Sequence, residues 1–144
     1  MRLSLALAAL LLSVSCRRFA TGDIPKIVFG RDACSRCGML VSEARFASGY
    51  VDESGNSVIF DDVGEMLSAA AEDPSFAKTV YVTDVEDGDW ARADAAVYVR
   101  TPSLATPMGS GMAAFKDRAR AEAFAKRSGG GVLDWAAAIL ARRR

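Results

Sequence analysis

The chain has 144 residues with 18 basic and 18 acidic side chains, so its formal net charge at neutral pH is zero. This balance gives no sign of a nucleic-acid partner, which would favour a basic surface. The length fits one domain or two very small ones, and 51% hydrophobic residues suffice for a core. The sequence contains no histidine, which excludes Ser-His and Cys-His catalytic pairs, His-ligated zinc and C-x-x-C-H haem attachment.

The chain begins with the features of a bacterial export signal. Arg2 is followed by an apolar run from Leu3 to Leu12, which is too short for a membrane span and typical of a signal peptide. Small residues then lead to Cys16, as in a lipoprotein signal, in which the cysteine becomes the lipidated N-terminus. Ser13 stands where such signals usually carry leucine, so ordinary secretion with cleavage nearby is the alternative. Either way, we expect the mature chain to leave the cytoplasm, and outside it a free C-x-x-C pair is prone to oxidation unless something protects or uses it.

A polar tether follows this signal. Residues 17–26 are polar and broken by glycine and proline, and we expect the folded part to begin near Ile27. The short basic end of the chain is predicted to be a solvated terminus. The predicted division is a signal peptide at 1–15, a lipidated cysteine and tether at 16–26, a folded domain at 27–140 and a basic tail at 141–144.

The first half of the folded part predicts strands and one helix. We expect strands at 46–52, 57–60 and 79–85, with a turn at 53–56 and a helix that begins after Asp62. Asp62 can cap this helix, and Glu65 three residues later can complete a capping box. Apolar residues at i, i+3, i+4 and i+7 then give the helix one apolar face.

The second half repeats this order. We expect strands at 95–100, 113–115 and 132–133, a helix from the cap Asp117 to Gly129, a terminal helix at 135–140 and a loop at 101–112. Strands and helices do not alternate as in a parallel βαβ sheet. The predicted fold class is therefore α+β, with two similar ββαβ units near 27–86 and 90–140 packed together.

Two cysteines, Cys34 and Cys37, lie in the segment DACSRCGML. Thiols at this spacing can form a disulfide, exchange disulfides, bind zinc or hold a soft metal. A structural zinc site needs four ligands, and the segment offers two thiols. A thioredoxin-like motif opens a helix after a strand, whereas here Gly38 and the apolar run 39–41 follow the second cysteine. A short-range disulfide and a soft-metal site both stay open at this point.

Three methionines supply further sulfur near glycines. Met39 follows Cys37 across Gly38, and Met108 and Met112 lie in the loop segment TPMGSGM. Cu(I) is a soft cation that prefers thiolate and thioether sulfur. Cys37, Met39 and Met108 would form such a site, and its few ligands would suit a carrier that exchanges copper between proteins. The alternative is that these methionines only fill gaps in the packing.

Six features occur in order along the chain: the signal with its cysteine and the motifs DACSRCGM, VIFDDVGEML, VYVTDVEDGDW, ARADAAVYV and TPMGSGMAAF. Together they resemble the NosL family, the accessory lipoproteins of bacterial nitrous-oxide reductase. The resemblance covers about residues 30–140. It implies a carrier without catalytic activity that binds one Cu(I), and a fold of two similar ββαβ units.

Carried over by position, the resemblance implies Cys37, Met39 and Met108 as the Cu(I) ligands. Cys34 is implied either as a further ligand or as a guard that forms a reversible disulfide with Cys37. Met112 is expected to serve packing or to act as an auxiliary ligand. Since the chain has no histidine, any imidazole ligand would have to come from a partner. The family also shares Asp61, Asp62, Asp84 and Trp90, for which we expect structural roles.

The resemblance implies delivery of copper to nitrous-oxide reductase, or to its ABC-transporter and periplasmic assembly proteins. It places the chain on the periplasmic face of the cell envelope, with a membrane anchor through Cys16, a soluble secreted protein being the alternative. Two rival functions stay open. In one, Cys34 and Cys37 cycle in a thiol-disulfide oxidoreductase or copper-site reductant; in the other, a lipid-tethered structural subunit carries a static disulfide.

Overall fold

The computed structural model describes residues 22–73, 75–76 and 78–142. The predicted signal peptide, the lipidation site at Cys16 and the first part of the tether lie outside the described residues. Among the described residues, no helix has the length and apolar character needed to cross a membrane.

Four short strands form the first sheet. They are β1 (Ser48–Val51), β2 (Ser57–Phe60), β3 (Tyr81–Thr83) and β4 (Trp90–Arg92), in the spatial order β2-β1-β3-β4 with antiparallel neighbours. A 3-10 turn, η1 (Ala44–Phe46), precedes β1. Gly55 takes a φ of 84° in the β1–β2 turn, a backbone conformation that glycine adopts at little cost. The helix α1 (Val63–Glu72) connects β2 to β3.

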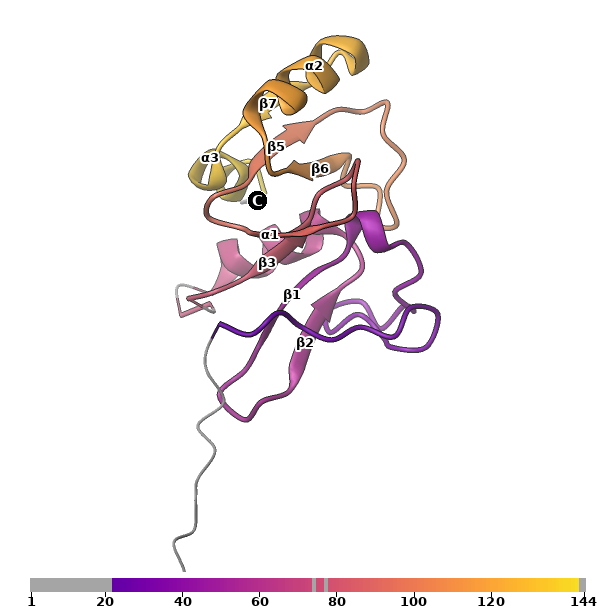
Figure 1. The fold of residues 1–144 in the computed structure, drawn as a ribbon, viewed down its shortest axis with the longest axis vertical. Coiled ribbons are helices and arrows are strands. Elements are labelled where there is room, and N and C mark those ends of the chain that lie inside the picture. Colours follow the sequence, from indigo (N-terminus) through magenta and orange to yellow (C-terminus); the bar gives the residue numbers. More distant parts are fainter. Residues whose placement is uncertain (1–21, 74, 77, 143–144) are drawn as a thin grey trace, which may run out of the picture.

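The second sheet contains three strands. They are β5 (Val97–Arg100), β6 (Met112–Phe115) and β7 (Gly131–Leu133), in the antiparallel order β6-β5-β7. The helix α2 (Arg118–Ser128) connects β6 to β7, and α3 (Trp135–Leu140) ends the fold. Figure 1 shows this sheet with α2 in the upper part of the molecule and the β1–β2 hairpin in the lower part.

Both sheets follow the chain in the same order. A hairpin comes first, a helix follows, and a third strand then pairs with the first strand of the hairpin, as the orders β2-β1-β3 and β6-β5-β7 show. The α+β class with two antiparallel sheets is therefore confirmed, whereas the description as two related units stays a prediction.

One hydrophobic cluster joins the two sheets. It contains residues of the first sheet and α1 together with residues of the second sheet and α3, among them Phe60, Val82, Met66, Leu67, Tyr98, Met112, Ala114 and Ala138. A smaller cluster lies between α2 and its own sheet and includes Val99, Phe115, Ala121 and Ala125. Because the larger cluster draws on both halves of the chain, neither half buries its apolar face alone.

A buried carboxylate adds a polar connection between the sheets. Asp84, immediately after β3, is fully buried and accepts hydrogen bonds at Oδ1 from the backbone N–H groups of Glu86 and Asp87, at 3.0 and 3.3 Å. Its Oδ2 accepts from the backbone N–H of Lys116, at 2.8 Å, and from the Arg120 guanidinium. The structural role expected for Asp84 therefore has a physical basis, since this side chain fastens the end of β3 to the start of α2.

Three local predictions need correction. The segment Trp90–Arg92 forms β4, where no strand was expected. Glu65 does not complete a capping box but makes ion pairs with Arg36 and Arg142. Arg142 is not part of a solvated tail: its side chain is 14% exposed, and its Nε donates to Gly64 O and Ser68 Oγ of α1.

Candidate metal centre

The cysteine segment forms a closed loop that lies on β2. The backbone N–H of Cys34 donates to Met39 O at 2.7 Å, and the N–H of Gly38 donates to Cys34 O at 2.9 Å. Gly38 has a φ of 75°, which a side chain would strain. Ser35 attaches the loop to β2, because its N–H donates to Ile59 O at 2.7 Å and its Oγ accepts from Ile59 N at 3.1 Å.

Arg36, between the two cysteines, fastens the same loop to α1. Its guanidinium pairs with Glu72 at 2.7 Å and with Glu65 at 3.0 Å. Glu65 also faces Arg142 at 3.8 Å, so the end of the chain supports the same face of α1. The positions of both cysteines are therefore set by β2 on one side and by α1 on the other.

Cys34, Cys37 and Asp61 bring their donor atoms together. One ligand atom from each, two sulfurs and a carboxylate oxygen, lies within 4.8 Å of the others. The Cys37 thiol donates to Asp61 Oδ1 at 3.6 Å. Cys34 and Asp61 are 3% and 1% exposed, whereas Cys37 is only partly buried. Both cysteines are free thiols, and Asp61 Oδ2 has no hydrogen-bond partner although it is buried.

The environment of Cys37 disfavours its thiolate. The pKa of Cys37 is raised to about 11, and burial is the main cause; a backbone hydrogen bond from Met39 lowers it, whereas the neighbouring Cys34 and the negative charge of Asp61 contribute to the increase. At neutral pH the metal-free protein therefore holds Cys37 as a neutral thiol. A redox-active or nucleophilic cysteine needs the opposite shift, towards a lower pKa.

We expect alkylation of Cys37 by iodoacetamide to be slow at pH 8, where a pKa of about 11 leaves about one thiol in a thousand ionised. The rate should rise about tenfold for each pH unit between pH 7 and 10. Mass spectrometry of the peptide that contains Cys37 measures this rate in the reduced wild-type protein, in which Cys34 is present. A rate that levels off below pH 9 would contradict the raised pKa.

A loop from the second sheet reaches the same place. The backbone N–H of Met108 donates to Asp62 Oδ2 at 2.9 Å, and Asp62 directly follows Asp61. The loop that carries Cys37 and the loop that carries Met108 therefore contact two adjacent residues, Asp61 and Asp62. Met39 and Met108 are 51% and 40% exposed, so both residues are open to solvent.

Met112 occupies a different environment from the other two loop methionines. It is the first residue of β6, pairs with Arg100 in the sheet and is fully buried in the larger cluster. This is the position of a packing residue, which was one of the two expected roles. Met66, on α1, is likewise fully buried, as its place on the apolar face predicted.

Asp61 is one of the four residues that sequence reasoning assigned to structural roles alone. Its carboxylate lies beside both cysteines, and one of its oxygens is left without a partner. The available signal was the pair of acidic residues directly after the apolar strand, of which one caps the helix. Since a helix needs only one cap, the other aspartate required a different explanation.

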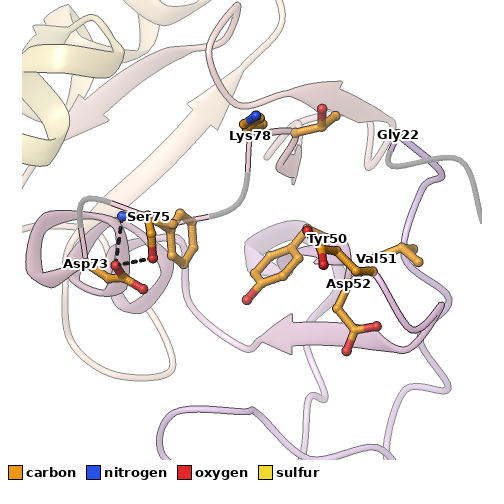
Figure 2. A pocket seen from close by; sticks show the side chains of 10 residues that line it. Gly22, Tyr50, Val51, Asp52, Asp73, Ser75 and Lys78 are labelled. Carbon is orange, nitrogen blue, oxygen red and sulfur yellow. Dashed lines mark hydrogen bonds between the residues drawn. The ribbon is translucent and has the colours of Figure 1, made fainter.

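A separate hollow of about 420 Å³ lies between the β1–β2 hairpin and the end of α1. Figure 2 shows Tyr50 and Asp52 on one side of it and Asp73 and Ser75 on the other, with hydrogen bonds from Ser75 to Asp73. The rings of Tyr50 and Phe76 meet edge-to-face, with centroids 5.5 Å apart. The lining residues that the structure describes include none of the predicted ligands, so this hollow is not the metal centre.

Comparisons with known proteins show the fold and the family of this chain. No curated protein sequence matches the chain. The crystal structure of the copper chaperone NosL from Shewanella denitrificans is similar, with a TM-score of 0.67 and 24% sequence identity, over 77% of this chain and 92% of that chain. This similarity supports the fold. A family model described as NosL matches residues 25–139, which is most of the sequence, and the chain therefore belongs to the NosL family.

Proposed function

We propose that this chain is a Cu(I)-binding metallochaperone, a metal carrier without catalytic activity of its own. The observation that carries this proposal is the meeting of two sulfur-bearing loops at Asp61 and Asp62. The similar solved structure is that of a copper chaperone, which supports the same function here.

The sulfur donors suit Cu(I) better than harder metals. Thiolate and thioether ligands are soft, and Cu(I) is the soft cation among the common biological metals. We propose Cys37, Met39 and Met108 as the ligands, with Cys34 and Asp61 beside them. Because Met39 and Met108 are exposed, ligands of a second protein can approach the copper and replace them one at a time, as transfer requires.

An anaerobic titration of the reduced protein with Cu(I), in competition with a chelator, tests this proposal. We expect one copper per chain, and Met108→Leu should weaken binding by about tenfold or more, since it removes a thioether ligand. Met112→Leu is the matched control, because it makes the same substitution at a buried position. Leucine and methionine have nearly the same volume, so this change should leave the affinity for Cu(I) unchanged. Equal affinity for the wild type and Met108→Leu would remove Met108 from the site.

A thiol-disulfide oxidoreductase that uses Cys34 and Cys37 is the second candidate, because the two sulfurs lie close together as free thiols. The raised pKa of Cys37 opposes it. That function requires both cysteines and neither methionine. Reduction of a disulfide substrate that persists in Met108→Leu and is lost in Cys34→Ser would favour this candidate over the carrier.

We also propose that the carrier is anchored through Cys16 at the periplasmic face of the envelope and that it delivers copper for nitrous-oxide reductase, directly or through its ABC-transporter and periplasmic assembly proteins. The family membership supports this location and this recipient. The shared strand order of the two sheets supports two related ββαβ units. A strain that lacks the gene for this chain and still produces copper-loaded nitrous-oxide reductase would contradict the delivery step. A Cys16→Ser protein that still partitions with membranes would contradict the lipid anchor.

A further inference from the structure

Asp62 makes more contacts than a helix cap requires. Its fully buried carboxylate accepts at Oδ1 from the N–H of Gly64, at 2.7 Å, and this bond caps α1. The same oxygen accepts from the hydroxyl of Ser110, and Oδ2 accepts from the N–H of Met108 at 2.9 Å. These two partners lie 48 and 46 residues away along the chain, in the loop before β6.

The other two aspartate caps of this fold lack such contacts. Among the hydrogen bonds of the described residues, the carboxylate of Asp117 accepts only from Arg120 N at the start of α2, and that of Asp134 only from Ala137 N at the start of α3. Capping therefore explains one of the three bonds made by Asp62. The remaining two hold the loop that carries Met108.

The start of α1 is shaped to receive this loop. A Cβ atom on Gly64 would lie 2.2 Å from Ser110 Cβ, so the close approach of Ser110 depends on the absence of a side chain there. The Ser110 hydroxyl also accepts from the N–H of Met112 at 3.1 Å, which connects the loop to β6. The carboxylate of Asp62 thus connects the start of α1 to the loop that precedes β6.

We propose that Asp62 is a positioning residue of the copper site, and that its second carboxylate oxygen fixes Met108 opposite Cys37. The adjacent Asp61 contacts the Cys37 thiol. Two neighbouring carboxylates therefore hold the Cys37 thiol and the backbone of Met108 in fixed positions relative to each other. This inference rests on the proposed function. It adds that the affinity for Cu(I) depends on a residue that supplies no ligand atom.

Asp62→Asn separates positioning from capping. Asparagine caps helices about as well as aspartate, so the amide oxygen can keep the bonds to Gly64 and Ser110. Its NH₂ group then faces the N–H of Met108, and two donors cannot bond to each other. We expect the affinity for Cu(I), measured by anaerobic chelator competition, to fall about tenfold, since bonds to charged acceptors are among the stronger ones. Asp117→Asn, the same change at an exposed cap, should leave the affinity unchanged.

A double-mutant cycle with Met108→Leu shows whether the effect passes through Met108. When leucine replaces Met108, Asp62→Asn should lower the affinity by no more than about twofold, because the thioether it positions is already absent. The same loss in both backgrounds, or no loss in Asp62→Asn alone, would overturn the inference. If the wild type binds Cu(I) through Met108 while Asp62→Asn binds equally well, only this inference fails; if the wild type does not bind Cu(I), the proposed function fails with it.

Ser110→Ala gives a milder form of the same test and covers the case in which Asp62→Asn does not fold. It removes the hydroxyl that bonds to Asp62 Oδ1 and leaves the bond from Met108 N in place. We expect a loss of about threefold in affinity for Cu(I), and this loss should disappear when Met108→Leu is added. A loss that persists in the absence of Met108 would overturn the positioning role.

Discussion

Replacing Cys37 with serine is expected to weaken Cu(I) binding by at least about 100-fold, the largest effect of any single substitution at the site. A hydroxyl is a hard, neutral donor, whereas Cys37 supplies the only partly exposed thiol among the described residues. The side chains are nearly isosteric, so the fold should be retained. Anaerobic competition of the reduced variant with a Cu(I) chelator measures the loss.

Cys34→Ser is the matched control for this result. Cys34 is 3% exposed and belongs to the larger hydrophobic cluster, so an incoming copper ion reaches Cys37 first. We expect Cys34→Ser to retain binding within about tenfold of the wild type. A Cys37→Ser protein that binds Cu(I) as tightly as the wild type would remove the thiolate from the site. Equal large losses in both variants would instead make Cys34 a full ligand.

Replacing Asp84 with alanine is expected to lower the free energy of unfolding by about 3 kcal/mol. The change leaves the partly buried hydrogen bonds from the backbone N–H groups of Glu86, Asp87 and Lys116 without their acceptor, and it removes an ion-pair partner of Arg120. Because a domain of this size is stabilised by only about 5–15 kcal/mol in total, the effect is large. Urea denaturation followed by circular dichroism measures it.

Asp87→Ala provides the comparison for Asp84. Asp87 also pairs with Lys116 and Arg120, but its side chain is 39% exposed, where water screens ion pairs. We expect its loss to cost much less stability than the loss of Asp84. Similar costs for the two substitutions would show that burial of Asp84 does not strengthen its contacts.

Elements whose causes are local could be predicted from the sequence. Asp62 and Asp117 cap α1 and α2 as expected, and Gly129 ends α2 with a φ of 67°. The turn at 53–56 joins β1 and β2, and β2 has the predicted bounds. In each case one residue or a short run sets the backbone conformation, so neighbours in the sequence carry the information.

Features that depend on distant partners could not be predicted in this way. β4 exists because Trp90–Arg92 pairs with β3, and its three residues show no strong alternation of their own. Arg142 is held by α1, more than 70 residues earlier in the chain. Likewise, Asp61 gains its place in the site from the cysteine loop that folds onto β2, which no local pattern encodes.

The site itself was accessible to sequence reasoning only in outline. Sulfur chemistry and the resemblance together predict Cys37, Met39 and Met108 as ligands, and this stays a prediction; the structure shows Cys37 in contact with Asp61 and Met108 in contact with the adjacent Asp62. The contacts that bring the loops together come from Asp61 and Asp62, whose spacing from Met108 has no periodic signature. Ligand identity follows from residue chemistry, whereas the arrangement of ligands follows from tertiary contacts.

Copper X-ray absorption spectroscopy of the Cu(I)-loaded wild-type protein tests the central claim most directly, because it identifies the atoms bound to the metal. The site described here predicts Cu(I) with sulfur as its only neighbouring element, contributed by Cys37, Met39 and Met108. A spectrum in which oxygen or nitrogen replaces the thioether sulfurs would contradict the site, as would a protein that fails to retain Cu(I) at all.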